Sequence, residues 1–425
     1  MKKAIVIALL PVCIFAQAQK IDKIINSAAV EHIEKILSSD SLRGRKVFTP
    51  DIEKAADFIS AEFKKAGLKP LKGAKDYRQH FEMLKPQVTS QQVQLDGVTV
   101  PGDDVVIVSA QEDINVNEQS GFTTVTAGAS DNFVNVVLGA VNSGKNTVVF
   151  MDSSFKKSLP RIKRFARQIL SGSATVVFVV SNTAPAHYTI TAKQSFERLP
   201  LSNIVGILPG KSKPNEYVIF SGHYDHLGVG KPVNGDSIYN GANDDAAGTT
   251  AVIMLAKYFK ALHNNERTLV FTAFTAEEIG EIGSTYFSKQ FNADKVVAMF
   301  NIEMIGTESK WGKNSAYITG YERTDMGKIL QKNLEGSNFM FYPDPYVKEN
   351  LFYRSDNASL ARVGVPAHTI STSKMDNEPN YHKVTDEIGT LDMNNMAEII
   401  KAIAISSQTI VSGKDTPSRV EKERM

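Results

Sequence analysis

The second half of the chain alternates between short apolar runs and helical patterns, and this alternation limits the possible folds more than any other feature. Buried strands are predicted for Tyr217–Ser221, Arg267–Phe274, Val296–Ile302 and Ala367–Ser371. Helices are predicted for Ala246–Leu262, Gly283–Phe291, Thr324–Asn333 and Met393–Ser407. Alternating strands and helices form a sheet with helices on both faces. We therefore expect an α/β fold, a three-layer α/β/α domain with a mostly parallel mixed central sheet.

The rest of the chain differs from this pattern in texture. Residues 19–85 contain two amphipathic helix patterns and are assigned to the main domain together with residues 200–412. Residues 86–199 have short β-branched runs, so we expect a largely β inserted domain there. Strands are predicted in it at Gln92–Leu95, Val105–Ser109, Val134–Leu138, Thr147–Met151 and Thr175–Val180. A charged, loose tail is expected over residues 413–425.

One segment of the inserted domain nearly spells a phosphate-binding loop. Gly139 to Asn146 contains the Gly-Lys pair, but Asn146 stands where Ser or Thr should contact magnesium. The segment also leads into a predicted strand, whereas a phosphate site needs a helix N-terminus. We interpret it as a turn between two strands.

The first residues have the features of a signal peptide. Lys2 and Lys3 precede an apolar run that is too short to cross a bilayer, and Ala16-Gln17-Ala18 has the small-x-small pattern of a cleavage site. Residues 1–18 are therefore predicted to direct export to the periplasm or the extracellular medium. The sequence has one cysteine, Cys13, so the mature chain would have no disulfide and no thiolate ligand.

The charge balance excludes one class of partner. The sequence has 48 basic and 46 acidic residues, and loss of Lys2 and Lys3 would leave 46 of each. Nucleic-acid binding would require a basic stripe, which is not seen, so no nucleic-acid partner is expected. No later stretch has the length and apolarity of a membrane span.

Histidines and acids follow the predicted strands where each one ends. His223 and Asp225 follow the first strand, Glu277 and Glu278 the second, and Glu303 the third. Asp244 precedes a helix, and His382 comes in a loop after the last strand. Because binding crevices form beyond the carboxyl ends of parallel strands, these side chains are expected to meet. Three other histidines are interpreted as structural: His226 in a loop, His263 at a helix end and His368 in the interior.

Imidazoles and carboxylates without thiolates are ligands that suit zinc. Their number is enough for two ions if one carboxylate bridges them, and two ions can activate a water and polarise a carbonyl. Glu277 and Glu278 are adjacent, so one can bind metal while the other accepts a proton from the water. Asp225, two residues after His223, is placed to accept its other ring N–H.

The motifs SLRGR (41–45), SGHYDHLG, NGANDDAAG, TAEEIGEIGS, NIEMIG and NYHKVTDE together resemble the M28-type zinc aminopeptidases, a family of co-catalytic metallo-exopeptidases. The resemblance covers most of residues 40–85 and 200–400. It implies that Asp244 bridges two Zn²⁺ ions, that Glu278 and His382 complete one site, and that His223 and Glu303 complete the other.

The resemblance also assigns the remaining roles. It implies that Glu277 is the general acid/base, that Asp225 supports His223, and that the Asp244–Asp245 peptide is cis. Tyr381 is a candidate to stabilise the oxyanion. Many members carry a protease-associated insert, of which residues 86–199 would be a divergent form. The chain departs from the family pattern at Glu303, where Asp is frequent, and at Asn357, where His is frequent.

The predicted function is that of a secreted zinc-dependent aminopeptidase whose partner is a peptide with a free N-terminus. Three alternatives stay open at this point. A glutaminyl cyclase-like enzyme would use one zinc ion, and a carboxypeptidase could be built on the same scaffold. A binding ectodomain that has kept the fold would hold no metal.

Overall fold

The computed structural model describes residues 20–422, which form two compact units. The main unit comprises residues 20–80 and 202–422, and the smaller unit comprises residues 81–201. Two long strands, β1 (Arg78–Leu95) and β9 (Tyr188–Leu208), carry the chain from one unit into the other. The predicted signal peptide, residues 1–18, lies outside the described residues.

The main unit is built on a mixed sheet with β10 (Lys213–His223) near its centre. β10 pairs in parallel with β13 (Arg267–Phe274) on one side and with β14 (Val296–Ile302) on the other. β14 pairs in parallel with β17 (Ala367–Ser371), and β15 (Ser315–Ile318) is antiparallel to β17. At the edges, β16 (Met340–Pro343) is parallel to β15, and β9 is antiparallel to β13. The mixed, mostly parallel sheet confirms the predicted fold class.

Apolar side chains of β10 fill the core on both faces of the sheet. Successive side chains of a strand point to opposite faces. Ile219 belongs to a buried cluster that includes Phe274 and Phe287. Its neighbour Phe220 stacks on Phe259 and Phe300, with ring centroids 5.4 and 4.9 Å apart. Burial on both faces is why this strand reads as a continuous apolar run in the sequence.

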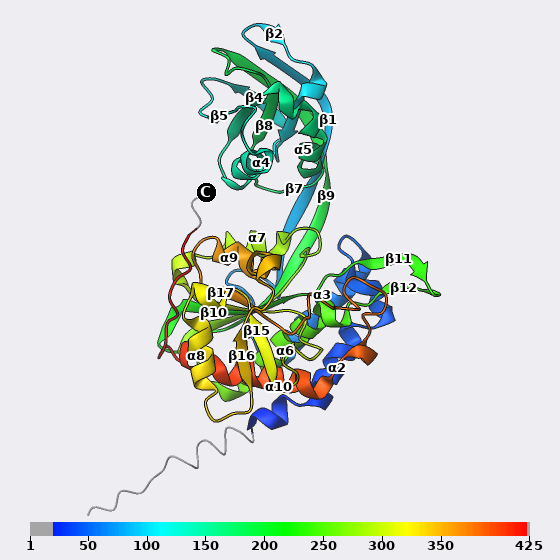
Figure 1. Ribbon diagram of the computed structural model, residues 1–425, viewed down its shortest axis with the longest axis vertical. Helices are drawn as coiled ribbons and strands as arrows, with labels where there is room; N and C mark the ends of the chain where they lie inside the picture. The colour runs from blue at the N-terminus through cyan, green and yellow to red at the C-terminus, as the bar shows by residue number, and fades with distance from the viewer. Residues whose placement is uncertain (1–19, 423–425) are drawn as a thin grey trace, which may run out of the picture. The chain divides into compact units, whose positions relative to one another are not determined.

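Helices cover both faces of the sheet (Figure 1). On the Phe220 face, α6 packs on β10 and also contacts α2, α3 and α10. The bounds on this face are α2 Ser27–Leu37, α3 Pro50–Lys65, α6 Ala247–Leu262 and α10 Met393–Ser406. On the other face lie α7 (Ile282–Ser288) and α9 (Asn357–Ala361), which contact each other. Helix α8 (Met326–Asn333) contacts α10, and α11 (Gln408–Val411) follows α10.

The smaller unit contains a four-stranded sheet of order β3-β8-β6-β5. Its strands are β3 Val105–Val108, β8 Val176–Val180, β6 Thr147–Met151 and β5 Thr123–Ala127. β4 (Asp113–Asn117) pairs with β9, and the short strands β2 (Val98–Thr99) and β7 (Ile169–Leu170) pair with β1. Helix α5 (Leu159–Phe165) contacts β3.

One predicted strand of the smaller unit is wrong. Residues 134–138 belong to helix α4 (Phe133–Asn142), whose N-cap Asn132 accepts hydrogen bonds from the amides of Val134 and Asn135. The segment from Gly139 to Asn146 is therefore the end of a helix and the turn into β6, and not a turn between two strands.

The expected loose tail is also wrong for residues 413–422. Val420 is 3% exposed in the cluster that contains Val296 and Val365. The guanidinium of Arg419 donates to the carbonyl oxygen of Val296 at 2.7 Å.

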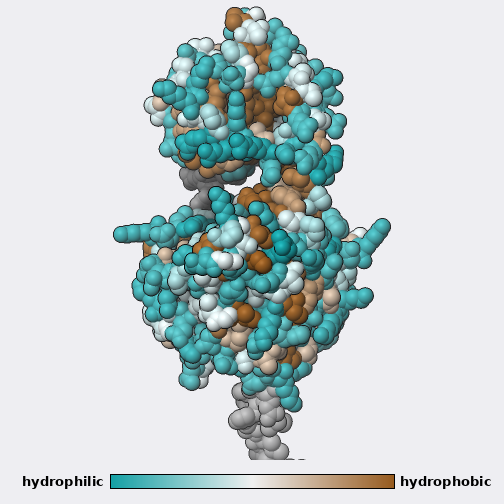
Figure 2. Space-filling view, turned by 90° about the vertical axis from the view of Figure 1, so that its right-hand side faces the viewer, coloured by the Kyte–Doolittle hydropathy of each residue, from teal (hydrophilic) through white to brown (hydrophobic). Residues whose placement is uncertain are grey.

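Within the described chain, helices that combine the length and the apolarity needed to cross a bilayer are not found. On the face drawn in Figure 2, hydrophilic residues predominate and hydrophobic ones are scattered among them.

Candidate metal centre

The carboxyl ends of three parallel strands bring acids and histidines to one edge of the central sheet. β10 ends at His223, β13 ends three residues before Glu277, and β14 ends one residue before Glu303. Asp244 lies in the helical turn η4 (Ala242–Ala246), which leads into α6. This edge is where the crevice of an α/β sheet forms. The structure therefore brings together the residues that the sequence placed at strand ends.

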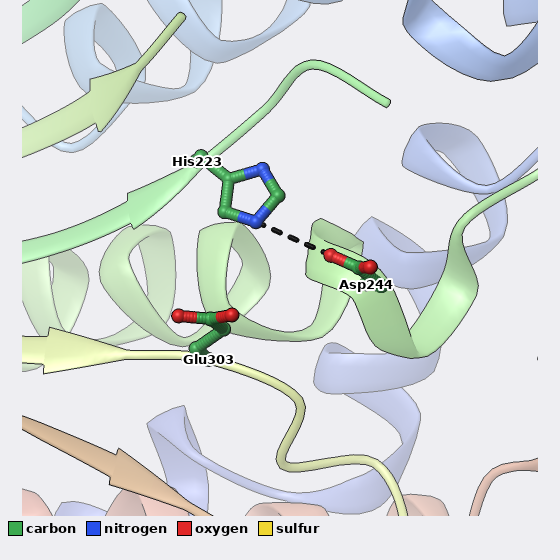
Figure 3. Close-up of side chains that lie close together, drawn as sticks. All are labelled: His223, Asp244 and Glu303. Atoms are coloured by element: carbon green, nitrogen blue, oxygen red, sulfur yellow. Dashed lines mark ion pairs between the residues drawn. The ribbon is translucent and has the colours of Figure 1, made fainter. Parts of the chain in front are cut away.

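The first candidate metal group consists of His223, Asp244 and Glu303, shown in Figure 3. One ligand atom from each residue lies within 4.8 Å of the others. His223 Nε2 is 3.2 Å from Asp244 Oδ1. All three side chains are buried or nearly so, which separates this group from the acidic clusters common on protein surfaces.

The second candidate group shares Asp244 and adds Glu278 and imidazoles. His226 Nδ1 is 2.7 Å from Glu278 Oε1 and 3.9 Å from Asp244 Oδ2. His382 Nε2 lies 3.2 Å from Asp244 Oδ2 and 3.2 Å from Glu278 Oε2. The two oxygens of Asp244 thus face different groups, Oδ1 towards His223 and Oδ2 towards His382. This is the arrangement that a bridging carboxylate requires.

Unpartnered buried atoms support a missing cation at this place. His223 Nε2 and Glu303 Oε2 are buried without a hydrogen-bond partner in the described chain. Buried polar atoms without partners are rare in folded proteins and indicate a missing water or ion. A donor set of imidazole nitrogens and carboxylate oxygens suits zinc. The residues present therefore fit two zinc ions that share Asp244.

The carboxylates crowd together strongly enough to perturb their protonation. Burial raises the pKa of the Glu277 carboxyl well above its usual value, His223 opposes the rise, and the charge of Glu303 adds to it. Burial likewise raises the pKa of Glu303 to about 7. The imidazoles of His223 and His382 overcome burial at Asp244 and hold its pKa well below the usual value. A bound cation would favour the ionised form of every carboxylate here.

A set of buried acids holds the backbone of the ligand-bearing segments. Asp245 accepts hydrogen bonds from the amides of His223 at 3.1 Å and Met304 at 3.1 Å. Asp386 accepts from the amides of Asn243 at 2.8 Å and Asp244 at 3.0 Å. Neither acid was predicted to have a role, because their partners are main-chain amides that carry no sequence signal.

Asp225 was predicted to accept the second ring N–H of His223 with its carboxylate. In the structure its main-chain carbonyl oxygen takes this position instead. The Nδ1 atom of His223 is hydrogen-bonded to the main-chain carbonyl oxygen of Asp225 at 3.1 Å, while the carboxylate is 3.9 Å away. The carboxylate instead accepts from the amides of Glu277 at 3.1 Å and Glu278 at 3.3 Å. Asp225 thus connects the His223 loop to the adjacent glutamates.

His226 lies in a loop as predicted, and it also belongs to the second candidate metal group. It is 1% exposed, contacts Glu278, and packs edge-on against His382 with ring centroids 5.7 Å apart. The predicted cis peptide between Asp244 and Asp245 is confirmed. His368 is buried as predicted, with hydrogen bonds to the carbonyl oxygen of Thr319 and the hydroxyl of Thr324.

A pocket of about 430 Å³, open solvent at its mouth included, adjoins the metal groups through Glu303 and Tyr381. Tyr381 stacks on His382, with ring centroids 3.9 Å apart. The hydroxyls of the pocket wall are largely engaged within the protein. For example, Tyr317 donates to the carbonyl oxygen of Ser373. The apolar lining consists of Met304, Leu351 and Met375, and Arg354 is the cation among the lining residues.

Asn357, where the family pattern frequently has His, is not among the residues that line this pocket. Its amide nitrogen donates to the carbonyl oxygens of Phe352 at 2.9 Å and Ala367 at 3.2 Å. Its oxygen accepts from the hydroxyl of Thr369 at 2.8 Å. Asn357 is buried and braces α9 against β17.

The fold and the paired ligand groups define a class, an α/β/α metal-binding domain of the aminopeptidase fold. Residues 203–406 match the sequence profile of Peptidase family M28. This segment carries every residue of both candidate metal groups. The match leaves the smaller unit and the N-terminal helices outside it.

Known proteins similar to this chain agree with the family. A probable leucine aminopeptidase of Trichophyton verrucosum (strain HKI 0517) is 30% identical over 209 residues, which are 47% of this chain and 54% of the relative. The chain thus spans about half the length of the curated relatives that it matches. An aminopeptidase structure from Aneurinibacillus sp. strain AM-1 superposes with a TM-score of 0.55 at 16% identity, covering 96% of this chain and 98% of the other. A zinc aminopeptidase from Bacillus subtilis gives 0.55 at 16% identity, with coverages of 94% and 99%.

Proposed function

We propose that this chain is a two-zinc aminopeptidase that hydrolyses the first peptide bond of a peptide with a free N-terminus. The observation that carries the proposal is the pair of ligand groups sharing Asp244, with an additional carboxylate, Glu277, beside them and in neither group. Metal-binding without catalysis would not need that extra carboxylate. The names of the similar proteins, a leucine aminopeptidase and zinc aminopeptidases, support the same activity.

His223 and Glu303 would hold one ion, Glu278 and His382 the other, and Asp244 both. When bound, two zinc ions supply Lewis acidity that polarises a carbonyl and lowers the pKa of water. Glu277 Oε2 lies 3.9 Å from His223 Nε2, so this carboxylate borders the first group. A carboxylate at that place can take the proton from the attacking water and then give it to the leaving amine.

The pocket beside Glu303 and Tyr381 would receive the side chain of the N-terminal residue. Its apolar lining is made by Met304, Leu351 and Met375, and Arg354 is already paired with Glu349 Oε2 at 3.4 Å. An uncharged side chain of moderate size, such as leucine or methionine, fits this lining better than a charged one, because burying an unpaired charge costs much more than burying apolar surface. Tyr381 would also lie near the reacting carbonyl, where its hydroxyl can donate a hydrogen bond to the developing oxyanion.

The experiment is a panel of aminoacyl chromogenic substrates, run with and without chelator, together with elemental analysis of the purified protein. We expect cleavage of leucyl and methionyl substrates ahead of aspartyl and lysyl ones, loss of activity with chelator, and two zinc ions per chain. One zinc ion with conversion of an N-terminal glutamine to pyroglutamate and release of ammonia would instead favour a cyclase. Cleavage only from a free C-terminus would favour a carboxypeptidase.

We also propose that the protein is exported and works outside the cytoplasm. The support is the basic start, the short apolar run and the Ala16-Gln17-Ala18 pattern in the sequence. Amino-terminal sequencing of the protein purified from its native host should begin at Gln19. A sequence that still contains residues 2–18 would contradict export by cleavage at this site.

A further inference from the structure

Arg45 is a fully buried arginine beside the metal groups, although it is not one of their ligands. It ends the N-terminal turn η1 (Asp40–Arg45) and is 1% exposed. Its Nε donates to the carbonyl oxygen of Tyr224 at 2.8 Å. Its Nη1 donates to those of Leu37 at 2.7 Å and Asn240 at 2.5 Å, and its Nη2 to that of Gly241 at 2.9 Å. Every one of these acceptors is a main-chain oxygen.

Three of the four acceptors lie on the loops that follow His223 and precede Asp244, and the fourth, Leu37, ends α2. Tyr224 directly follows the candidate ligand His223, and Gly241 precedes the turn that contains Asp244. In return, the amide of His226 donates to the carbonyl oxygen of Arg45 at 3.3 Å. One guanidinium thus joins the loop after β10 to the loop before α6. Those loops are 15 or more residues apart in sequence.

Only arginine has donors arranged for this task. Its planar fork presents five N–H groups in fixed directions, whereas lysine has a compact ammonium that cannot span carbonyls on opposite sides. The burial of a cation is costly unless nearby charges and hydrogen bonds compensate it. The nearby carboxylates of Glu34, Asp386 and Asp244 act on Arg45 in this compensating sense, because their charges raise its pKa against the effect of burial.

The backbone around Arg45 is strained, which indicates that this placement is maintained against a cost. Arg43, Gly44 and Arg45 have left-handed φ values of 43°, 69° and 47°. A side chain at Gly44 would lie 2.4 Å from the carbonyl oxygen of Tyr239 and 2.7 Å from that of Gly228. Strained conformations of this kind persist where the surrounding structure requires them and cluster at functional sites.

A second tether connects the same parts of the chain. The side-chain nitrogen of Asn240 donates to the carbonyl oxygen of Ser38 at 2.7 Å and to Asp40 Oδ1 at 2.9 Å. The N-terminal segment therefore binds the loop before Asp244 in two ways. The Arg45 side chain donates to main-chain oxygens of that loop, and Ser38 and Asp40 accept hydrogen bonds from Asn240.

We propose that Arg45 is a positioning residue of the metal centre: it fixes the separation of the loops that carry His223 and Asp244, and so sets the affinity and geometry of metal binding. This role holds for whichever bond the protein hydrolyses, since it concerns the metal site alone. Residues that orient ligands from behind typically change metal affinity by about 10- to 100-fold when they are replaced.

The chain offers a matched control in Arg267. This arginine is also 1% exposed, and its Nη1 donates to the carbonyl oxygens of Ile410 and Asp415, both at 2.7 Å. It begins β13, whereas the metal groups lie beyond the carboxyl ends of the strands. Arg267→Lys should therefore lower stability without changing metal binding.

The test compares Arg45→Lys with Arg267→Lys in the full-length protein. The zinc affinity is measured by competition with a chromogenic chelator, the absorption spectrum is recorded after cobalt(II) substitution, and the metal-free proteins are melted by circular dichroism. We expect Arg45→Lys to bind zinc at least about 10-fold more weakly than wild type and to shift the cobalt spectrum. Arg267→Lys should melt earlier and match the wild type in both metal readouts.

Asn240→Ala is measured alongside, so that the result does not depend on the folding of Arg45→Lys. It keeps the guanidinium and removes only the second tether, and we expect a smaller loss of zinc affinity in the same direction. The proposal is overturned if the variants that fold bind zinc as tightly as wild type with an unchanged cobalt spectrum, or if Arg267→Lys weakens zinc binding to the same extent.

Discussion

Glu277 has the position and the environment of a proton carrier, and its removal should separate chemistry from metal binding. Glu277→Gln keeps the shape of the side chain and loses the proton acceptor. Because Glu277 belongs to neither ligand group, the variant should keep its zinc while kcat falls by about 10²- to 10⁴-fold. Zinc content by elemental analysis and kcat on a leucyl substrate give the two readouts.

Glu281, four residues after Glu277, offers a control with the same substitution. Glu281 is paired with Arg362 Nη1 at 3.4 Å, away from both metal groups, so Glu281→Gln should retain turnover within a few-fold of wild type. Full activity in Glu277→Gln would remove this residue from the mechanism. Loss of zinc from it would show that the carboxylate is a ligand instead.

His368 should make the stability of the fold depend on mildly acidic pH. Burial lowers its pKa to about 4 from the ordinary 6.5. The unfolded chain therefore binds a proton at this histidine in a pH range where the folded chain does not. The stabilisation is complete above pH 6.5 and is lost as the pH falls towards 4, and for this group it amounts to about 3 kcal/mol.

The measurement is the free energy of unfolding at several pH values in wild type and His368→Gln, both with metal removed. The wild type should lose more stability than the variant between pH 6.5 and 4, whatever the stability of the variant at pH 7. Parallel curves for the two proteins would mean that His368 does not titrate as described.

The meeting of His223, Glu278 and Glu303 could be predicted from the sequence because these candidate ligands follow strand ends, where chain order and sheet geometry together imply a meeting point. Their supporting residues could not. Arg45, Asp245 and Asp386 hold the site through main-chain amides and carbonyls, and such partners leave no pattern in the sequence. His226 belongs to the second candidate group and was expected to be structural, because a loop histidine alone usually is.

Among the elements, α4 shows how a valine-rich segment can mislead. Residues 133–142 contain several valines, which favour strands, and so a strand was predicted. The buried positions Val137 and Ala140 and the half-buried Phe133, Val136 and Val141 follow helical spacing and pack into one cluster. The helical spacing of these apolar residues was present in the sequence. It outweighs their β propensity because the helix can bury this apolar side against the sheet.

The C-terminal segment is expected to contribute to stability, because it closes the end of the sheet opposite the metal groups. Arg267 donates to the carbonyl oxygen of Asp415 and to Thr416 Oγ1, and Val420 is buried. Ending the chain at Gly413 would expose that core and leave buried guanidinium donors unpaired. We expect a loss of about 3 kcal/mol or more in the free energy of unfolding, measured by urea denaturation.

A point variant tests the apolar part of this loss. Val420→Ala removes two methyl groups from the cluster and should cost about 1.5 kcal/mol. Zinc affinity should be unchanged in both proteins, since the segment is remote from the metal-bearing strand ends. An equally stable truncated chain would mean that this segment contributes nothing to the fold.

At the scale of the whole molecule, the chain combines a unit that can bind metal with one that shows no such group. Both candidate ligand groups of the described chain lie in the main unit, within residues 223–303 and His382. The inserted domain predicted for residues 86–199 has nearly the same bounds as the smaller unit, residues 81–201. What the sequence did not reveal is that β1 and β9 run continuously across those boundaries, since only Gln92–Leu95 was predicted as a strand within them.

This division predicts that metal acts on only one of two unfolding transitions. Zinc at 100 times its Kd stabilises the unit that binds it by about 2.7 kcal/mol, which corresponds to a shift of about 5–10 °C for a unit of this size. In differential scanning calorimetry, addition of a chelator should therefore lower the Tm of the larger transition and leave the other in place. A ligand shifts an unfolding transition only if it binds the unit that unfolds there, or a unit that unfolds cooperatively with it. A shift of both transitions would therefore mean that the strands shared by the two units couple their unfolding.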